Sequence, residues 1–154
     1  MIPVILSIKH IRQRAQGDCV VACAAMALDH IGISADYNRL MKLLRLIEGV
    51  GTASYHVREL EQLGIVVVYK RGTLTELHDH LTHNRPSIAF VKTADLPYWD
   101  EAVDHAVVVA GLDDDHVHLN DPAFDYAPIR VSRGDFGLAW LERDEVYSTF
   151  MRQN

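Results

Sequence analysis

Cys19 is the residue of this sequence best placed for covalent chemistry. It opens an apolar segment over residues 19–31 that follows Asp18, a good helix N-cap, and ends at Gly32. In the first turn of a helix, unpaired N–H groups and the helix dipole favour the thiolate, which is the nucleophilic form of cysteine. Cys23 lies one turn deeper and is better interpreted as a small buried hydrophobic residue. The segment predicts Cys19 as a nucleophile, with a second structural cysteine as the alternative.

A nucleophilic thiolate needs a histidine that protonates the leaving group and a third residue that orients the histidine. Among nine histidines, His105 stands at the entrance of an apolar strand predicted over residues 105–112. A turn over residues 113–115 and a second strand over residues 116–120 then lead to Asp121. If the two strands pair as a hairpin, Asp121 returns to the neighbourhood of His105. Taken singly, His105 is better interpreted as an exposed residue at a strand end and Asp121 as a turn-forming residue.

Acyl transfer also needs hydrogen-bond donors directed at the developing oxyanion. The backbone N–H of Cys19 is one natural donor. A side-chain amide just upstream is the second, and both Gln13 and Gln16 are available there.

The remaining segments predict the frame that positions these residues. Helical spacing or helix-capping signals occur over residues 34–49, 54–63, 73–83 and 135–141. Strand patterns occur over residues 65–69, 87–92, 105–112, 116–120, 129–132 and 145–150. Because helices dominate the first half and strands the second, we expect an α+β domain with helices packed on one antiparallel sheet.

Composition narrows the function class. The chain has 154 residues, 49% hydrophobic and 23% charged, which is typical of one globular soluble domain spanning residues 1–154. A formal charge of −6 argues against nucleic-acid binding, and the apolar runs are too short for a membrane span. Met1 begins a segment without the features of a signal peptide, so we expect a cytoplasmic protein. Two cysteines exclude a disulfide framework.

Three segments together resemble a known family. Residues 13–23 (Gln-Arg-Ala-Gln-Gly-Asp-Cys-Val-Val-Ala-Cys), 105–109 (His-Ala-Val-Val-Val) and 120–123 (Asn-Asp-Pro-Ala) are similar to the bacteriocin-processing, double-glycine leader peptidases. These belong to the papain-like cysteine peptidases. The resemblance implies a papain-like fold in which N-terminal helices, with the nucleophile at the start of the central helix, pack on a C-terminal antiparallel sheet. It implies no cofactor.

The resemblance also implies roles for individual residues. Cys19 would be the nucleophile, His105 the general base and Asp121 its orienting partner. Gln13, six residues before the nucleophile, would be the oxyanion donor in preference to Gln16.

The substrate site is expected around these residues. Gly51 and Thr52 resemble a Gly-Thr pair of the family, and Asp104 precedes His105. The loop containing Tyr98 and Trp99 is expected to form a wall of the cleft. The implied partners are a peptide or protein substrate and, because the transporter usually fused to these peptidases is not in this chain, a separately encoded export system.

Three alternatives remain open. The same residues also suit a deamidase or an acyl transferase. A catalytically silent peptide-binding module is suggested by Val20, which stands where the leader peptidases usually carry glycine. A metal site formed by Cys19 and Cys23 with His116 and His118 is the least favoured alternative, because its ligand spacing is unusual.

Overall fold

An antiparallel sheet of seven strands runs through the computed structural model, which describes residues 1–153. Six strands lie in the order β2-β7-β3-β4-β5-β6, and β1 pairs with β4. The strands are β1 (Val4–Ile5), β2 (Ile65–Arg71), β3 (Ser87–Lys92), β4 (Asp104–Leu112), β5 (His116–Asn120), β6 (Ile129–Ser132) and β7 (Val146–Arg152). The helices are α1 (Cys19–His30), α2 (Tyr37–Leu43), α3 (Leu74–Thr82) and α4 (Arg133–Leu141), with 3-10 helices η1 (Ser54–Leu63) and η2 (Thr93–Asp95).

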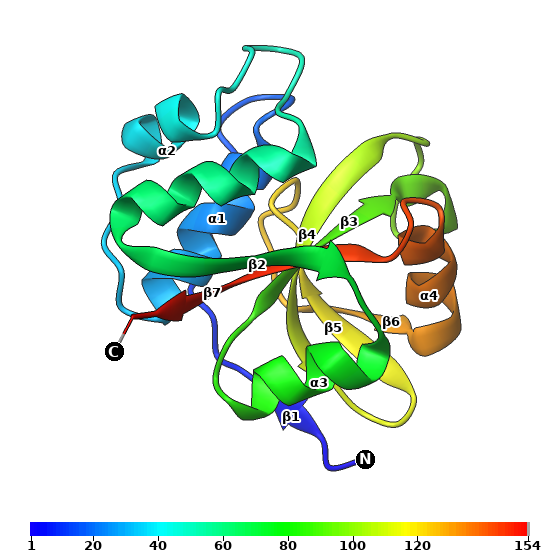
Figure 1. Ribbon diagram of the computed structural model, residues 1–154. Helices are drawn as coiled ribbons and strands as arrows, with labels where there is room; N and C mark the ends of the chain where they lie inside the picture. The colour runs from blue at the N-terminus through cyan, green and yellow to red at the C-terminus, as the bar shows by residue number, and fades with distance from the viewer. Residues whose placement is uncertain (154) are drawn as a thin grey trace.

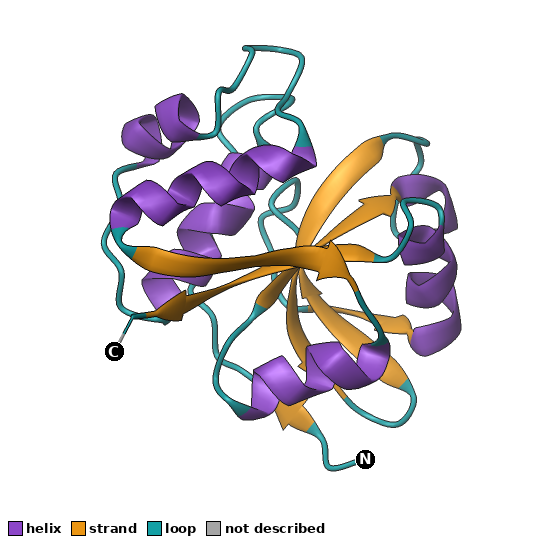
Figure 2. Cartoon of the chain, in the orientation of Figure 1, coloured by secondary structure: helices purple, strands orange, loops and turns teal. Residues whose placement is uncertain are grey.

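Helices cover both faces of the sheet, as Figures 1 and 2 show. In β3, Ile88 and Phe90 belong to the hydrophobic core shared with α1, α2 and η1. Ala89 and Val91 alternate with them and belong to a second core, shared with α3 and α4. Because successive strand residues point to opposite faces, a strand covered on both sides must be apolar at nearly every position.

Helix α1 is the central helix of the first core. Every residue from Val20 to Leu28 is buried, and the helix contacts β3, β4 and β7. It ends before Gly32, whose φ of +79° suits glycine, as predicted. Its first residue, Cys19, thereby lies near the beginning of β4. Within residues 1–153, none of the helices is both long enough and apolar enough to cross a membrane.

The β4–β5 hairpin forms as predicted. Asp113 begins the turn, and its carboxylate accepts hydrogen bonds from the N–H groups of Asp115 at 2.9 Å and His116 at 2.7 Å. Val108 then pairs with Asn120, the last residue of β5. Asp121 follows directly and returns toward the start of β4.

The predicted α+β class, with helices on an antiparallel sheet, is confirmed, and several details differ. The helix predicted over residues 34–49 is only α2, because the chain leaves helical geometry at Arg45, whose φ is +55°. Strand β1 was not predicted. It is two residues long, too short for alternation to reveal it, and it exists because Val4 and Ile5 pair with Leu112 and Gly111.

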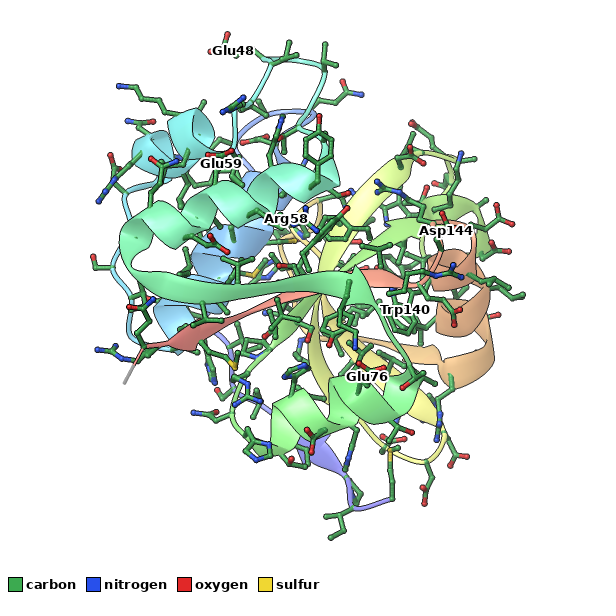
Figure 3. The ribbon with its side chains drawn as sticks, viewed as in Figure 1. Glu48, Arg58, Glu59, Glu76, Trp140 and Asp144 are labelled. Atoms are coloured by element: carbon green, nitrogen blue, oxygen red, sulfur yellow. The ribbon has the colours of Figure 1, made fainter. Side chains whose placement is uncertain are left out.

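The second face of the sheet was also not predicted to carry helices. Helix α4 packs there through Phe136 and Trp140, and the indole N–H of Trp140 donates to the carbonyl of Val146 at 2.9 Å. Figure 3 labels Trp140 on α4 and Glu76 on α3. This packing places the residues that follow α4, beginning with Glu142, near β4.

Candidate active site

Cys19 lines a cleft of about 370 Å³ between α1, the loop before η1 and the start of β4. The cleft is lined by Gly17, Cys19, Val20, Ile47, Val50, Gly51, Thr52, Ala53, Ser54, Phe90, Asp104, His105 and Arg143. Cys23 is fully buried, and burial, followed by the negative charge of Cys19 and Asp121, raises the pKa of the Cys23 thiol well above its ordinary value. The two cysteines therefore differ in access, and Cys23 is a poor source of thiolate.

His105 and Asp121 form a buried pair at the edge of this cleft. The Nε2 atom of His105 lies 2.7 Å from Oδ1 of Asp121, and both side chains are almost fully buried. This leaves Nδ1 as the ring nitrogen that is free of Asp121, and His105 lines the same cleft as Cys19. The hairpin thus brings together the two residues that the sequence predicted it would.

Asp121 is held by four donors. Besides His105, Oδ2 accepts from the Tyr98 hydroxyl at 2.8 Å and from the Trp99 indole N–H at 2.9 Å. Oδ1 accepts from the backbone N–H of Ala123 at 3.0 Å. Burial acts to raise the pKa of the Asp121 carboxyl, but the hydrogen bond and charge of His105 outweigh it and the pKa is lowered. Asp121 is therefore a carboxylate, with its orientation defined from both oxygens.

The pKa of His105 is strongly shifted from its ordinary value. Burial lowers its pKa, but hydrogen bonds to Asp121 and to Cys19, and the charges of both partners, raise the pKa to about 9. The Trp99 ring stands edge-on to the imidazole, with ring centroids 4.8 Å apart. An imidazolium stabilised between a carboxylate and a sulfur atom is the arrangement needed for a thiolate nucleophile.

Gln13 lies next to this group through its backbone. Its N–H donates to the carbonyl of Pro122 at 2.9 Å, which joins its loop to the residue after Asp121. The side-chain Nε2 donates to the carbonyl of Ala15 at 3.1 Å, and within residues 1–153 the buried Oε1 has no hydrogen-bond partner. Gln13 and Gln16 line a neighbouring depression and not the Cys19 cleft.

Asp18 does not cap α1 through its side chain, which corrects the predicted capping role. Its buried carboxylate instead accepts from the N–H groups of Arg14 at 3.1 Å and Ala15 at 2.9 Å, and from the hydroxyl of Tyr37. Burial and the hydrogen bond to Asp18 raise the pKa of Tyr37. The carboxylate therefore organises the turn between Gln13 and Cys19. An aspartate directly before the helix was the available signal, but sequence alone does not separate a cap from a loop anchor.

Three of the four residues predicted to bind substrate line the cleft: Gly51, Thr52 and Asp104. Gly51 has φ of +128°, and a Cβ atom at this position would lie 3.2 Å from the carbonyl oxygen of Gly17. The backbones of Gly17 and Gly51 therefore approach closely beside Cys19, and glycine at position 51 permits both the conformation and the approach.

Tyr98 and Trp99, the predicted wall, are not among the residues that line the Cys19 cleft. Both side chains donate to Asp121, and Trp99 lines the depression that contains Gln13. The physical reason is that a buried carboxylate requires several donors, which these two rings supply. Arg143 and Phe90 also line the cleft. Neither was predicted, because each reaches the cleft through tertiary packing and carries no local signal.

The metal-site alternative does not form. Within residues 1–153, no three side chains of the His, Cys, Asp and Glu types are grouped to hold a metal ion. His118 pairs instead with Asp113, with Nε2 and Oδ2 3.0 Å apart.

Known proteins share both the sequence pattern and the fold. The family model of peptidase C39 matches residues 7–143. No curated protein sequence matches this chain. Among solved structures, a C39-like peptidase from Bacillus anthracis has a TM-score of 0.80 and 20% identity over 100% of both chains. The peptidase domain of Streptococcus ComA, a bi-functional ABC transporter involved in a quorum-sensing pathway, has a TM-score of 0.75 and 22% identity over 94% of this chain and 98% of that one.

A third solved structure is a double glycine motif protease from an AMS/PCAT transporter in complex with the leader peptide. Its TM-score is 0.72, with 17% identity over 98% of each chain. At such identities the likeness shows a shared fold, while the family match covers most of this chain. This chain is therefore a cysteine-type peptidase and belongs to the peptidase C39 family.

Proposed function

We propose that this peptidase hydrolyses a peptide bond in a leader or precursor peptide, with Cys19 as nucleophile, His105 as general acid and base, and Asp121 as the orienting residue. The observation that carries the proposal is the buried His105–Asp121 pair at 2.7 Å, placed beside a cysteine at the start of a buried helix. Cys23 is fully buried and has no comparable access.

The reaction follows from this geometry. The Cys19 thiolate attacks the carbonyl carbon, and the imidazolium of His105 gives its proton to the leaving amine as the C–N bond breaks. The product is a thioester on Cys19 and a free amine. His105, now neutral, takes a proton from water as the water attacks the thioester, and the acid product leaves with the Cys19 sulfur restored.

Asp121 and Gln13 support the two charges that develop. Asp121 holds the Nε2 side of His105, so that Nδ1 remains directed at the sulfur, and it stabilises the imidazolium. The backbone N–H of Cys19 and the Gln13 amide are the proposed oxyanion donors. For that role the Gln13 side-chain amide turns from the Ala15 carbonyl toward the cleft, while the backbone bond from Gln13 to Pro122 is kept.

The proposed substrate class rests on the family and on the limited space in the cleft beside Cys19. A relative of the same fold was solved with a leader peptide. In this chain the close approach of Gly17 and Gly51, together with the side chain of Val20, bounds the space beside Cys19, which favours small residues at the cleavage point. A separately encoded export system is the proposed partner that would take up the processed peptide.

Mass spectrometry of precursor peptides with double-glycine leaders tests this function. We expect the wild-type protein to cut the peptide after the glycine pair and Cys19→Ala to leave it intact. Cys23→Ala, the same substitution on the same helix, should retain cleavage. An uncut peptide whose mass has increased by deamidation would support the deamidase alternative. A Cys19→Ala protein that keeps every effect of the wild type would indicate a silent binding module.

A further inference from the structure

We propose that the guanidinium of Arg143 binds a carboxylate of the substrate in the Cys19 cleft, which gives the peptidase a preference for an acidic side chain near the bond that it cuts. This inference rests on the proposed function, since it defines one subsite of the same cleft. It concerns selectivity and leaves the roles of Cys19, His105 and Asp121 unchanged.

Arg143 is fixed in place at the cleft. It follows α4, lines the same cleft as Cys19 and His105, and is half-buried. One guanidinium nitrogen donates to the backbone carbonyl of His105 at 3.2 Å, and the guanidinium carbon lies 5.6 Å from the centroid of the Phe90 ring. These two contacts hold the cation next to the catalytic histidine before any substrate arrives.

The charge of Arg143 is not neutralised by a neighbour. In the described part of the chain, no carboxylate oxygen lies within 4.0 Å of its guanidinium. Asp104 is the one carboxylate that lines the cleft among these residues, and it pairs with Lys92 at 3.4 Å. A guanidinium offers five N–H donors, and a single protein acceptor engages Arg143. The remaining coplanar N–H groups of the guanidinium can form a bidentate hydrogen bond with a carboxylate.

The neighbouring charges indicate on which side the carboxylate binds. A second cleft of about 350 Å³ shares Ser54, Phe90, Asp104 and Arg143 with the first. It is also lined by Glu142 and Asp144, the residues on either side of Arg143, and Figure 3 labels Asp144 in the turn after α4. Lys92 also lines this second cleft, but it pairs with Asp104. Glu142 and Asp144 would therefore repel an acidic group there, so the favourable position lies on the Cys19 side of Arg143.

A carboxylate can come from an aspartate or glutamate side chain or from the C-terminus of a peptide. We assign the side chain, because the cleft continues past Arg143 into the second cleft and therefore accommodates a chain that does not end there. A terminal carboxylate is an outcome that the test below separates.

Affinity selection with the Cys19→Ala protein tests this subsite without requiring cleavage. Random peptides with amidated C-termini are captured, eluted and sequenced, and a parallel library carries free C-termini. We expect glutamate over glutamine, and aspartate over asparagine, to be enriched about tenfold or more at one position. Adding Arg143→Gln should abolish this enrichment, whereas Lys70→Gln, which removes an exposed cation that pairs with Glu76 outside both clefts, should retain it.

Two results would overturn the assignment. One is equal capture of acidic and amide residues by the Cys19→Ala protein, and the other is an enrichment that survives Arg143→Gln. Selection that depends on a free C-terminus, with no positional preference in the amidated library, would replace the side-chain assignment by a terminal carboxylate. Arg143→Lys keeps the positive charge but loses the bidentate geometry of the guanidinium. This variant should therefore retain part of the acidic preference, even if Arg143→Gln folds poorly.

Failure of the subsite and failure of the proposed function give different results. If wild-type protein cuts precursor peptides but the selection shows no acidic preference, the proposed hydrolysis is supported and the proposed role of Arg143 is wrong. If acidic peptides are enriched through Arg143 but the wild-type protein cuts none of them, the proposed subsite is supported as part of a binding module and the hydrolysis proposal is wrong.

Discussion

The backbone N–H of Gln13 donates to the carbonyl of Pro122 at 2.9 Å, although more than a hundred residues separate the two in the sequence. This bond joins the loop that leads into α1 to the residue that follows Asp121. The proposed oxyanion donor and the orienting carboxylate are therefore tied to one another as well as to Cys19. Substitutions in either loop are expected to act on the same reaction, which the following predictions use.

Replacing Asp121 by asparagine should impair catalysis while preserving the shape of the site. The variant loses the negative charge that stabilises the imidazolium and leaves a donor from Tyr98 or Trp99 without a charged acceptor. We expect kcat to fall by about 100-fold to 10,000-fold. NMR titration of the His105 ring should show its pKa falling from about 9 toward the ordinary value of 6.5. Asp113→Asn, which removes an aspartate that pairs with His118 outside the cleft, should leave kcat unchanged.

Tyr98 is predicted to position Asp121 through its hydroxyl. Tyr98→Phe removes one of the two donors to Oδ2, while Trp99 at 2.9 Å remains. Because a hydrogen bond to a charged group contributes about 2 kcal/mol, urea unfolding should show a loss of roughly that size. We expect kcat to decrease several-fold with little change in KM. The exposed Tyr126 provides a matched control, and an equal loss in Tyr126→Phe would remove the positioning role from Tyr98.

Asp18 should be required for the turn that carries Gln13. Asp18→Ala removes the acceptor for two backbone N–H groups and the Tyr37 hydroxyl. We expect the free energy of unfolding to fall by about 3 kcal/mol and kcat to fall with it, because buried donors lose their partner and the turn before Cys19 loosens. Asp36→Ala is the control, since Asp36 also precedes a helix without capping it. Equal effects of the two substitutions would contradict a specific anchoring role.

The two cysteines should react differently with iodoacetamide. Cys19 is accessible from the cleft, whereas Cys23 is fully buried and its thiol has a raised pKa. Peptide mapping after brief treatment at about pH 6 should therefore find the label on Cys19 alone. His105→Ala removes the imidazolium that favours the thiolate, so the labelling rate should fall about tenfold or more. Labelling of Cys19 at the same rate in this variant would show that no ion pair exists.

Activity and stability should both depend on the protonation of His105. Its pKa is raised in the folded state from 6.5 to about 9. Protonation therefore favours the folded state, a contribution that is fully present below about pH 6.5 and is lost as the pH rises through about 9. We expect kcat to decline over the same alkaline limb, because neutral His105 cannot protonate the leaving amine. In urea unfolding at several pH values, His105→Gln should lack the part of the pH dependence that lies between these values.

Much of the frame could be predicted from local pattern. Strands β3, β5 and β6 and the helix η1 have the predicted bounds, because alternation, turn residues and glycine stops are properties of short segments. The approach of His105 and Asp121 was predictable for the same reason, since a hairpin with a tight turn returns the chain to its own start. The resemblance of residues 13–23 to a family added the choice of Gln13 over Gln16.

Local sequence pattern was enough to predict most of the elements, the hairpin and the residue types that can perform thiol chemistry. Three contacts depend on how distant segments pack: Asp18 anchors a loop and caps no helix, Tyr98 and Trp99 donate to Asp121, and Arg143 reaches His105 from the end of α4. Periodicity specifies which face of an element is buried, but it does not specify which distant element will cover that face. The partners of a buried polar group are set by that packing, because a charge removed from water must be satisfied by whatever donors the folded chain brings to it.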